Sequence, residues 1–100
     1  MPTAFSEIIK SNTPTLVDFS AEWCGPCKMM KPVLQELKSR MGDKTKIIKV
    51  DIDQSPQAAN AYSIRSVPTL ILFRSGEIKW RQSGVVSAEY LQQIISQHSS

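Results

Sequence analysis

Apolar side chains recur along the chain with two different periods, and each period predicts a different kind of element. Over residues 24–41 they lie three and four positions apart, which gathers them on one face of a helix that Gly42 ends. The runs 15–20 and 46–52 are short and rich in apolar and β-branched residues, a composition typical of strands. Two such strands joined by a long helix predict a right-handed parallel βαβ unit.

Proline, glycine and serine mark where the later elements begin and turn. Ser55 and Pro56 suit an N-cap and a first helical position, and Ser75-Gly76 suits a two-residue hairpin turn. The further elements predicted are helices over residues 4–11 and 56–62, antiparallel strands over 69–73 and 77–82, and a last helix that Ser87 caps, with Leu91, Ile94, Ile95 and His98 on one face. The predicted fold class is α/β, a central mixed sheet with helices on both sides.

Length and charge limit the classes of function. One hundred residues suffice for a single domain over residues 1–100. Twelve Lys and Arg against nine Asp and Glu give a net charge of +3, but the basic residues are scattered, so nucleic-acid binding is not indicated. No stretch approaches the roughly 18 apolar residues of a membrane span, and the first residues lack the basic and apolar segments of a secretion signal. We therefore expect a cytoplasmic protein that binds neither nucleic acid nor membrane, and a monomer.

Both cysteines lie in the hexapeptide WCGPCK, residues 23–28, between a predicted strand and the long helix. Cβ atoms three positions apart on a regular helix are about 5 to 6 Å apart, whereas a disulfide needs about 3.8 Å. Cys24 must therefore lie at the adjustable end of the helix. Gly25 relaxes such a turn, and Pro26 gives up only an N–H that has no partner within the helix.

This position gives the two thiols different chemistry. Free N–H groups and the positive end of the helix dipole stabilise a thiolate at Cys24 and lower the pKa of its thiol, which makes Cys24 the expected nucleophile. Cys27, one turn deeper, is expected to be more buried and more protonated, placed to resolve a mixed disulfide. A disulfide that closes four residues adds only about 2 kcal/mol of chain-entropy stabilisation, so it is better suited to being made and broken than to holding a fold.

Two other roles for the cysteine pair are less well supported. A closed zinc site needs four ligands, and His98 is the one further soft or imidazole candidate, near a polar terminus where a frayed helix end is ordinary. The cysteines could also be inert core residues, but Trp23 and Lys28 beside them suggest a partly exposed site.

At these residues the chain resembles the thioredoxin family. Besides the hexapeptide, the similarity covers Val17-Asp18-Phe19, Lys49-Val50-Asp51-Ile52-Asp53, Val67-Pro68-Thr69-Leu70, Gly76 and Gly84. It implies a thioredoxin-like three-layer fold that lacks the N-terminal strand of many members, and the activity of a general protein disulfide reductase with no metal or organic cofactor. The partners it implies are proteins with disulfides and an electron donor of the thioredoxin-reductase type.

The resemblance also implies that Asp18 is a buried carboxylate near Cys27 that relays its proton. Desolvation inside an apolar strand raises the pKa of an acid toward neutrality and makes it a usable base. Lys49, on the neighbouring strand, is placed to moderate that rise. The alternatives left open are an Asp18 that only hydrogen-bonds within the fold and a Lys49 that is simply solvated.

For the substrate side, the resemblance implies a cis peptide bond between Val67 and Pro68 that packs against the cysteines. The backbone of Val67 is then free to pair with an extended segment of the substrate. The implied apolar rim around Cys24 comprises Trp23, Ile64 and Gly84, with Gly25 and Pro26 of the hexapeptide.

Two positions depart from the family pattern and bear on partner preference. Ser20 stands where some members carry a tryptophan, and Ser66 where many carry a glycine. A partner-specific or extracytoplasmic thiol reductase therefore stays open, as does a thioredoxin-like module that binds partners without turnover. Trp80 is expected to be a half-buried packing residue.

Overall fold

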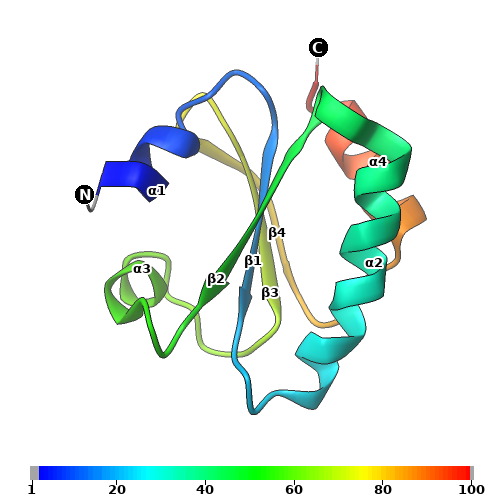
Figure 1. The fold of residues 1–100 in the computed structure, drawn as a ribbon. Coiled ribbons are helices and arrows are strands. Elements are labelled where there is room, and N and C mark those ends of the chain that lie inside the picture. The colour runs from blue at the N-terminus through cyan, green and yellow to red at the C-terminus, as the bar shows by residue number, and fades with distance from the viewer. Residues whose placement is uncertain (1–2, 100) are drawn as a thin grey trace.

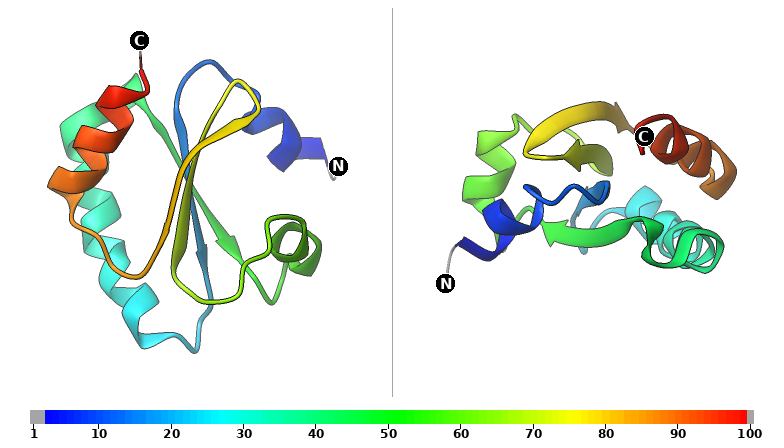
Figure 2. Two further views of the ribbon diagram at one scale, coloured as in Figure 1. Left: turned by 180° about the vertical axis from the view of Figure 1, so that it is seen from behind. Right: turned by 90° about the horizontal axis from the view of Figure 1, so that it is seen from above.

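In the computed structural model, which describes residues 3–99, four strands form one mixed sheet between two pairs of helices. The elements in chain order are α1 (Thr3–Ile8), β1 (Thr15–Ser20), α2 (Gly25–Met41), the 3-10 turn η1 (Gly42–Lys44), β2 (Lys46–Asp51), α3 (Pro56–Ala61), β3 (Thr69–Arg74), β4 (Glu77–Ser83) and α4 (Ala88–Gln97). Figure 1 shows α1 and α3 on one side of the sheet and α2 and α4 on the other. The view from above in Figure 2 separates the same three layers, which confirms the predicted α/β class.

The strand order in the sheet is β2-β1-β3-β4. β1 and β2 run parallel and are joined through α2, whereas β3 is antiparallel to both β1 and β4. The predicted βαβ unit and the predicted hairpin are therefore confirmed. At the hairpin turn Ser75 and Gly76 have φ angles of 55° and 81°, and two positive φ angles in succession match the twist of the flanking strands. Within residues 3–99 no strand precedes β1.

Alternate residues of the central strands enter two different cores, because successive side chains of a strand point to opposite faces. On the face covered by α2 and α4, the buried strand residues are Leu16, Leu70 and Leu72. On the face covered by α1 and α3, they are Val17, Phe19, Val50, Ile71 and Phe73. β1 and β3 are thus buried on both faces, which explains their nearly uninterrupted apolar sequences.

The long helix α2 is built as its apolar period predicts. Met30, Leu37 and Met41 are buried in the core under α2 and α4, and Val33 and Leu34 pack against the same core. Gly42 ends the helix with a φ of 55°, a conformation that glycine adopts at little cost. No helix among residues 3–99 is long and apolar enough to cross a membrane.

Several observed ends differ from the predicted ones, by three residues at the end of the first helix and by one residue at α2, β2, α3, β3 and β4. The first helix was expected over residues 4–11 but ends at Ile8, since the N–H groups of Lys10 and Ser11 bond to carbonyls only three residues back. The strand expected to reach residue 52 ends at Asp51, whose carboxylate accepts the N–H groups of Asp53 and Gln54. In both cases a local turn competes with continuation of the element.

Candidate active site

The two cysteines lie where the chain passes from β1 into α2, at the lower end of the sheet in Figure 1. Cys24 is the N-cap of α2 and Cys27 lies in its first turn; a disulfide joins them, with the Cα atoms 5.3 Å apart. The backbone at Cys24 is extended, and its Sγ accepts a hydrogen bond from the N–H of Cys27 at 3.1 Å. The sulfur of Cys24 therefore meets a free N–H group of the helix end, the arrangement that stabilises a thiolate.

The expectation that Cys27 is more buried than Cys24 is wrong for the oxidised pair. Both cysteines are 4% exposed. They form one cluster with Ala21, against which Ile52 and Val67 pack, because the disulfide holds the two sulfurs together in the same small core. In the oxidised pair the two cysteines therefore differ in their places at the start of α2 and not in exposure.

The segment before β3 lies against the disulfide. The Val67–Pro68 peptide bond is cis, as the resemblance implies. The carbonyl oxygen of Val67 is 3.6 Å from the Sγ of Cys24. The N–H of Gly84 donates to the carbonyl of Pro68 at 2.8 Å, and the φ of 94° at Gly84 is one that other residues rarely adopt.

The residues expected to form the apolar rim around Cys24 differ in exposure and in the core that they contact. Trp23 is 69% exposed, and Gly25 and Pro26 are exposed beside it. A Cβ added at Gly25 would meet nothing within 4 Å, so the turn itself leaves room for a larger residue. Ile64 is half-buried and packs with the core under α1 and α3, and no contact places it in the cysteine cluster.

Sequence analysis missed the residue that orients Trp23. The indole N–H of Trp23 donates to Oδ2 of Asp53 at 2.9 Å. Asp53 is itself held by its backbone N–H, which donates to the carboxylate of Asp51 at 2.8 Å. The signal was present, because aspartates where a strand ends favour such turns, but the indole partner is 30 residues away in sequence.

Asp18 is buried on the α2 face of β1, with 1% of its surface exposed. Its Oδ1 has no hydrogen-bond partner among the described residues. Burial raises the pKa of Asp18 to about 6, and the nearby charge of Lys49 partly lowers it. The strand register places these two residues side by side on β1 and β2.

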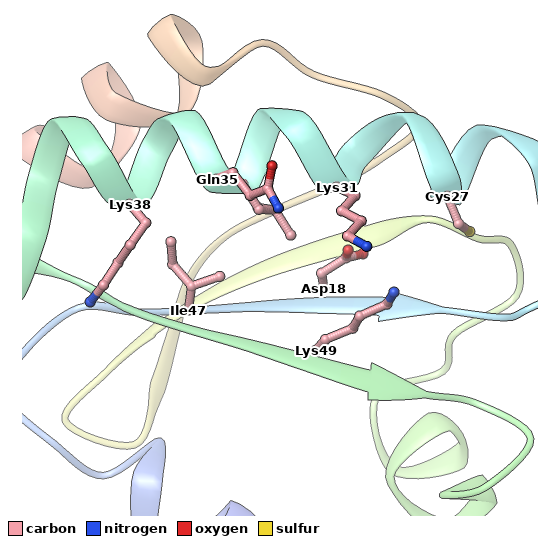
Figure 3. A pocket seen from close by; sticks show the side chains of 8 residues that line it. Asp18, Cys27, Lys31, Gln35, Lys38, Ile47 and Lys49 are labelled. Atoms are coloured by element: carbon pink, nitrogen blue, oxygen red, sulfur yellow. The ribbon is translucent and has the colours of Figure 1, made fainter.

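A pocket of about 370 Å³ lies between α2 and β2 and reaches both Asp18 and Cys27. In Figure 3 the side chains of Lys31, from α2, and Lys49, from β2, both point toward the Asp18 carboxylate. The remaining lining residues are Leu34, Gln35, Lys38 and Ile47. The pocket is large enough for water beside the unpaired oxygen of Asp18. Lys31, a residue that sequence analysis did not single out, belongs to this site.

No group of three or more His, Cys, Asp or Glu residues able to hold a metal ion occurs among residues 3–99. His98 forms the C-cap of α4, where its carbonyl accepts a hydrogen bond from Arg74 at 3.0 Å. Trp80 is half-buried and packs edge-to-face on Tyr90, with ring centroids 6.1 Å apart, in agreement with the packing role expected for it.

Comparison with known proteins places this site in context. The family model described as Thioredoxin matches residues 1–97. The thioredoxin of Bacillus subtilis is 46% identical over 83 residues, which are 83% of this chain and 80% of that protein. The thioredoxin of Rickettsia prowazekii is 45% identical over 80 residues, which are 80% of this chain and 76% of the relative.

Solved structures show the same similarity. A mutant thioredoxin from Halobacterium salinarum superimposes with a TM-score of 0.88 at 34% identity, covering 98% of this chain and 85% of that one. The oxidised form of mitochondrial thioredoxin 3 from Saccharomyces cerevisiae gives a TM-score of 0.85 at 34% identity, covering 96% of this chain and 89% of that one.

Proposed function

This chain belongs to the thioredoxin family and is a thiol–disulfide oxidoreductase, and we propose that it acts as a general reductase of protein disulfides. The observation that carries the proposal is the disulfide between Cys24 and Cys27 at the N-terminus of α2. It closes too short a loop to add much stability, and it places a sulfur beside a free helix N–H group.

The first step starts from the reduced pair. The Cys24 thiolate, stabilised by the N–H of Cys27, attacks one sulfur of a disulfide in the partner protein. A new bond forms between that sulfur and Cys24, the partner's own S–S bond breaks, and its other sulfur leaves as a thiolate that takes up a proton. The product is a mixed disulfide between the two proteins.

The second step releases the partner. Cys27 loses its proton and attacks the sulfur of Cys24, which forms the Cys24–Cys27 disulfide and expels the partner's second thiolate. Two electrons have then passed from this pair to the partner. Asp18 is the base for Cys27, acting through water, and the pocket that both residues line supports this role. Lys49 holds the pKa of Asp18 below the value that burial alone would give.

Substrate binding uses the segment beside Cys24. An extended stretch of the partner pairs with the backbone of Val67, which brings the partner's disulfide to the Sγ of Cys24. The contact between the Val67 carbonyl and that sulfur supports this arrangement. The rest of the proposed binding surface consists of Trp23, Gly25, Pro26, Ile64, Pro68 and Gly84.

Electrons return to the pair from an external donor of the thioredoxin-reductase type, so the cycle needs no metal or organic cofactor. We place the protein in the cytoplasm as a monomer with a single thioredoxin domain over residues 1–100. Its relatives at 45 and 46% identity are named thioredoxin, which supports the activity of a disulfide reductase.

Reduction of insulin, with dithiothreitol as the electron source, tests the proposal. The parent protein is expected to accelerate the reaction, and Cys24→Ser is expected to abolish the acceleration. Cys27→Ser is expected to stop turnover and to accumulate a mixed disulfide, detected by mass under non-reducing conditions. Ser39→Ala, at an exposed position of α2, serves as the control. Full activity of Cys24→Ser would instead favour a module that binds partners without turnover.

A further inference from the structure

The loop between α3 and β3, residues 63–68, contains Val67, whose carbonyl faces Cys24. Side chains of β4 form hydrogen bonds at both ends of this loop. The strand β4 lies at one edge of the sheet, antiparallel to β3. Its register pairs Arg81 with Ile71 and Ser83 with Thr69, so both side chains point to the face that α3 covers. Figure 1 shows the loop running from α3 to the lower end of β3.

Arg81 holds the beginning of the loop. Its guanidinium donates through Nη1 to the carbonyl of Tyr62 and through Nη2 to the carbonyl of Ser63, the latter at 2.9 Å. Tyr62 is the C-cap of α3, where carbonyl groups lack partners within the helix. A cation at this end also complements the helix dipole. Ser63 has a φ of 53°, so Arg81 bonds to the residue at which the chain leaves the helix.

Ser83 holds the end of the loop through a second side chain. The hydroxyl of Thr69 donates to the carbonyl of Ser66 at 2.7 Å, and it lies 2.8 Å from the hydroxyl of Ser83. A hydroxyl has one hydrogen, and that of Thr69 goes to the carbonyl, so Ser83 must be the donor to Thr69. The result is a chain of hydrogen bonds from Ser83 through Thr69 to the residue that precedes Val67.

Both ends of the loop therefore form hydrogen bonds with side chains of β4. The residue that follows β4, Gly84, forms a third attachment. The N–H of Gly84, directly after Ser83, donates to the carbonyl of Pro68. Between these attachments the carbonyl of Val67 lies 3.6 Å from the sulfur of Cys24. A shift of the loop relative to β4 would change this distance and the line along which a partner's backbone can pair.

We propose that Arg81 and Ser83 are positioning residues that set the affinity for protein substrates by fixing the backbone of Val67 against Cys24. The inference rests on the proposed function, because it requires an extended protein segment to bind at Val67. A small disulfide reacts with the Cys24 sulfur without such pairing, so its reduction should be almost independent of the loop. A variant that disturbs only the position of the loop should therefore lose activity toward protein substrates alone, whereas a variant with a damaged active site should lose activity toward both kinds of substrate.

The test compares steady-state reduction of insulin, with dithiothreitol as the electron source, with a single reduction of the aromatic disulfide 5,5′-dithiobis(2-nitrobenzoate) by the prereduced protein. The second reaction is run without dithiothreitol, because dithiothreitol would reduce this small disulfide directly. Arg81→Gln and Ser83→Ala are expected to raise KM for insulin roughly 3- to 10-fold, in line with the loss of hydrogen bonds that hold the loop. Their second-order rate constant for reduction of the aromatic disulfide by the prereduced protein is expected to stay within about twofold of the parent. Ser83→Thr keeps the hydroxyl on a residue that suits a strand, and it should restore the parent KM.

Lys79→Gln is the matched control for Arg81→Gln. It removes the same charge from the same strand, but Lys79 bonds to Glu77 and not to the loop. An unchanged KM for insulin in both Arg81→Gln and Ser83→Ala would overturn the inference, and so would an equal loss with both substrates. A parent protein that reduces the aromatic disulfide but not insulin would overturn the proposed function instead.

Discussion

At the scale of single residues, the carboxyl of Asp18 lies in an unfavourable, buried environment. It lies inside the sheet, one of its oxygens has no partner among residues 3–99, and the charge of Lys49 on the next strand compensates its burial only in part. Burying an ionised group without full compensation destabilises the folded state. Asp18 should therefore affect the stability of the folded state, and through its raised pKa it should also affect the release step at Cys27.

Asp18 makes stability depend on pH in a direction that its raised pKa decides. The pKa is about 6 in the folded protein against an ordinary 3.8, so between these values the folded state binds more protons than the unfolded chain. The free energy of unfolding therefore falls as pH rises from about 4 to 6, by about 3 kcal/mol in all, and this contribution stays lost above that window. Urea unfolding of the oxidised protein at pH 4.5 and pH 7 measures the difference.

Asp18→Asn is expected to remove this pH dependence. Since the amide carries no charge, the variant should be more stable than the parent at pH 7, by about 2 to 3 kcal/mol. The gap should close at pH 4.5, where the parent carboxyl is largely protonated. Equal stability of the two proteins at pH 7 would show that the carboxylate is well compensated in the parent.

The same variant is expected to slow the second chemical step. At pH 7 Cys27 needs a base, whereas pH 9 lies above the pKa of about 8.5 of a free cysteine, so the need for a base is smaller there. Release from a preformed mixed disulfide at Cys24 should therefore be slowed by Asp18→Asn more at pH 7 than at pH 9. Stopped-flow measurement of release follows this step, and equal rates for parent and variant at pH 7 would contradict the relay.

Among the elements, the helix ends show how local chemistry decides where a helix begins. Ser87 caps α4 by accepting the N–H of Tyr90 at 3.1 Å. In α2 the same N-cap position is filled by Cys24, whose sulfur accepts the N–H of Cys27. One geometry thus serves stability in the first case and thiolate chemistry in the second.

Removal of the α4 cap has a measurable cost. Ser87→Ala is expected to lower the free energy of unfolding by about 1 kcal/mol, because the N–H of Tyr90 loses its acceptor. Ser96→Ala, at an exposed position within the same helix, is the control and should change stability by a few tenths of a kcal/mol at most. Chemical denaturation of both variants measures the difference, and equal values would argue against a capping role for Ser87.

At the scale of the whole molecule, the two hydrophobic cores lie on opposite faces of the sheet and support different helices. The core under α2 and α4 supports the helix that carries the cysteines. The core under α1 and α3 contains an aromatic cluster of Phe5, Phe19, Tyr62 and Phe73. The centroids of the rings in contact are 5.2 to 6.4 Å apart. Figure 1 shows α1 near the upper end of the sheet, away from the start of α2.

This separation predicts that stability and chemistry respond differently to a change in α1. Phe5→Ala is expected to lower the free energy of unfolding by about 2 kcal/mol, less than for a fully buried phenylalanine because Phe5 is half-buried. The rate of reduction of the aromatic disulfide should stay unchanged under native conditions. Ile78→Ala, at a side chain 48% exposed, is the control, and a similar loss of stability there would show that the aromatic cluster has no special role.

The sequence by itself determined the features that depend on neighbours a few residues away. The apolar periods define β1 and α2, Gly42 ends α2, and Ser75-Gly76 turns the hairpin, because each follows from backbone preferences within one or two turns of chain. The spacing of Cys24 and Cys27 is of this kind too, since the start of one helix brings their sulfurs together.

Only the tertiary structure decided what depends on residues distant in sequence. It placed Lys31 beside Asp18, Asp53 at the indole N–H of Trp23, and Arg81 on the carbonyls of Tyr62 and Ser63. It also made the two cysteines equally buried. The sheet and helices had to pack before these groups met, and no local period or cap encodes such a meeting.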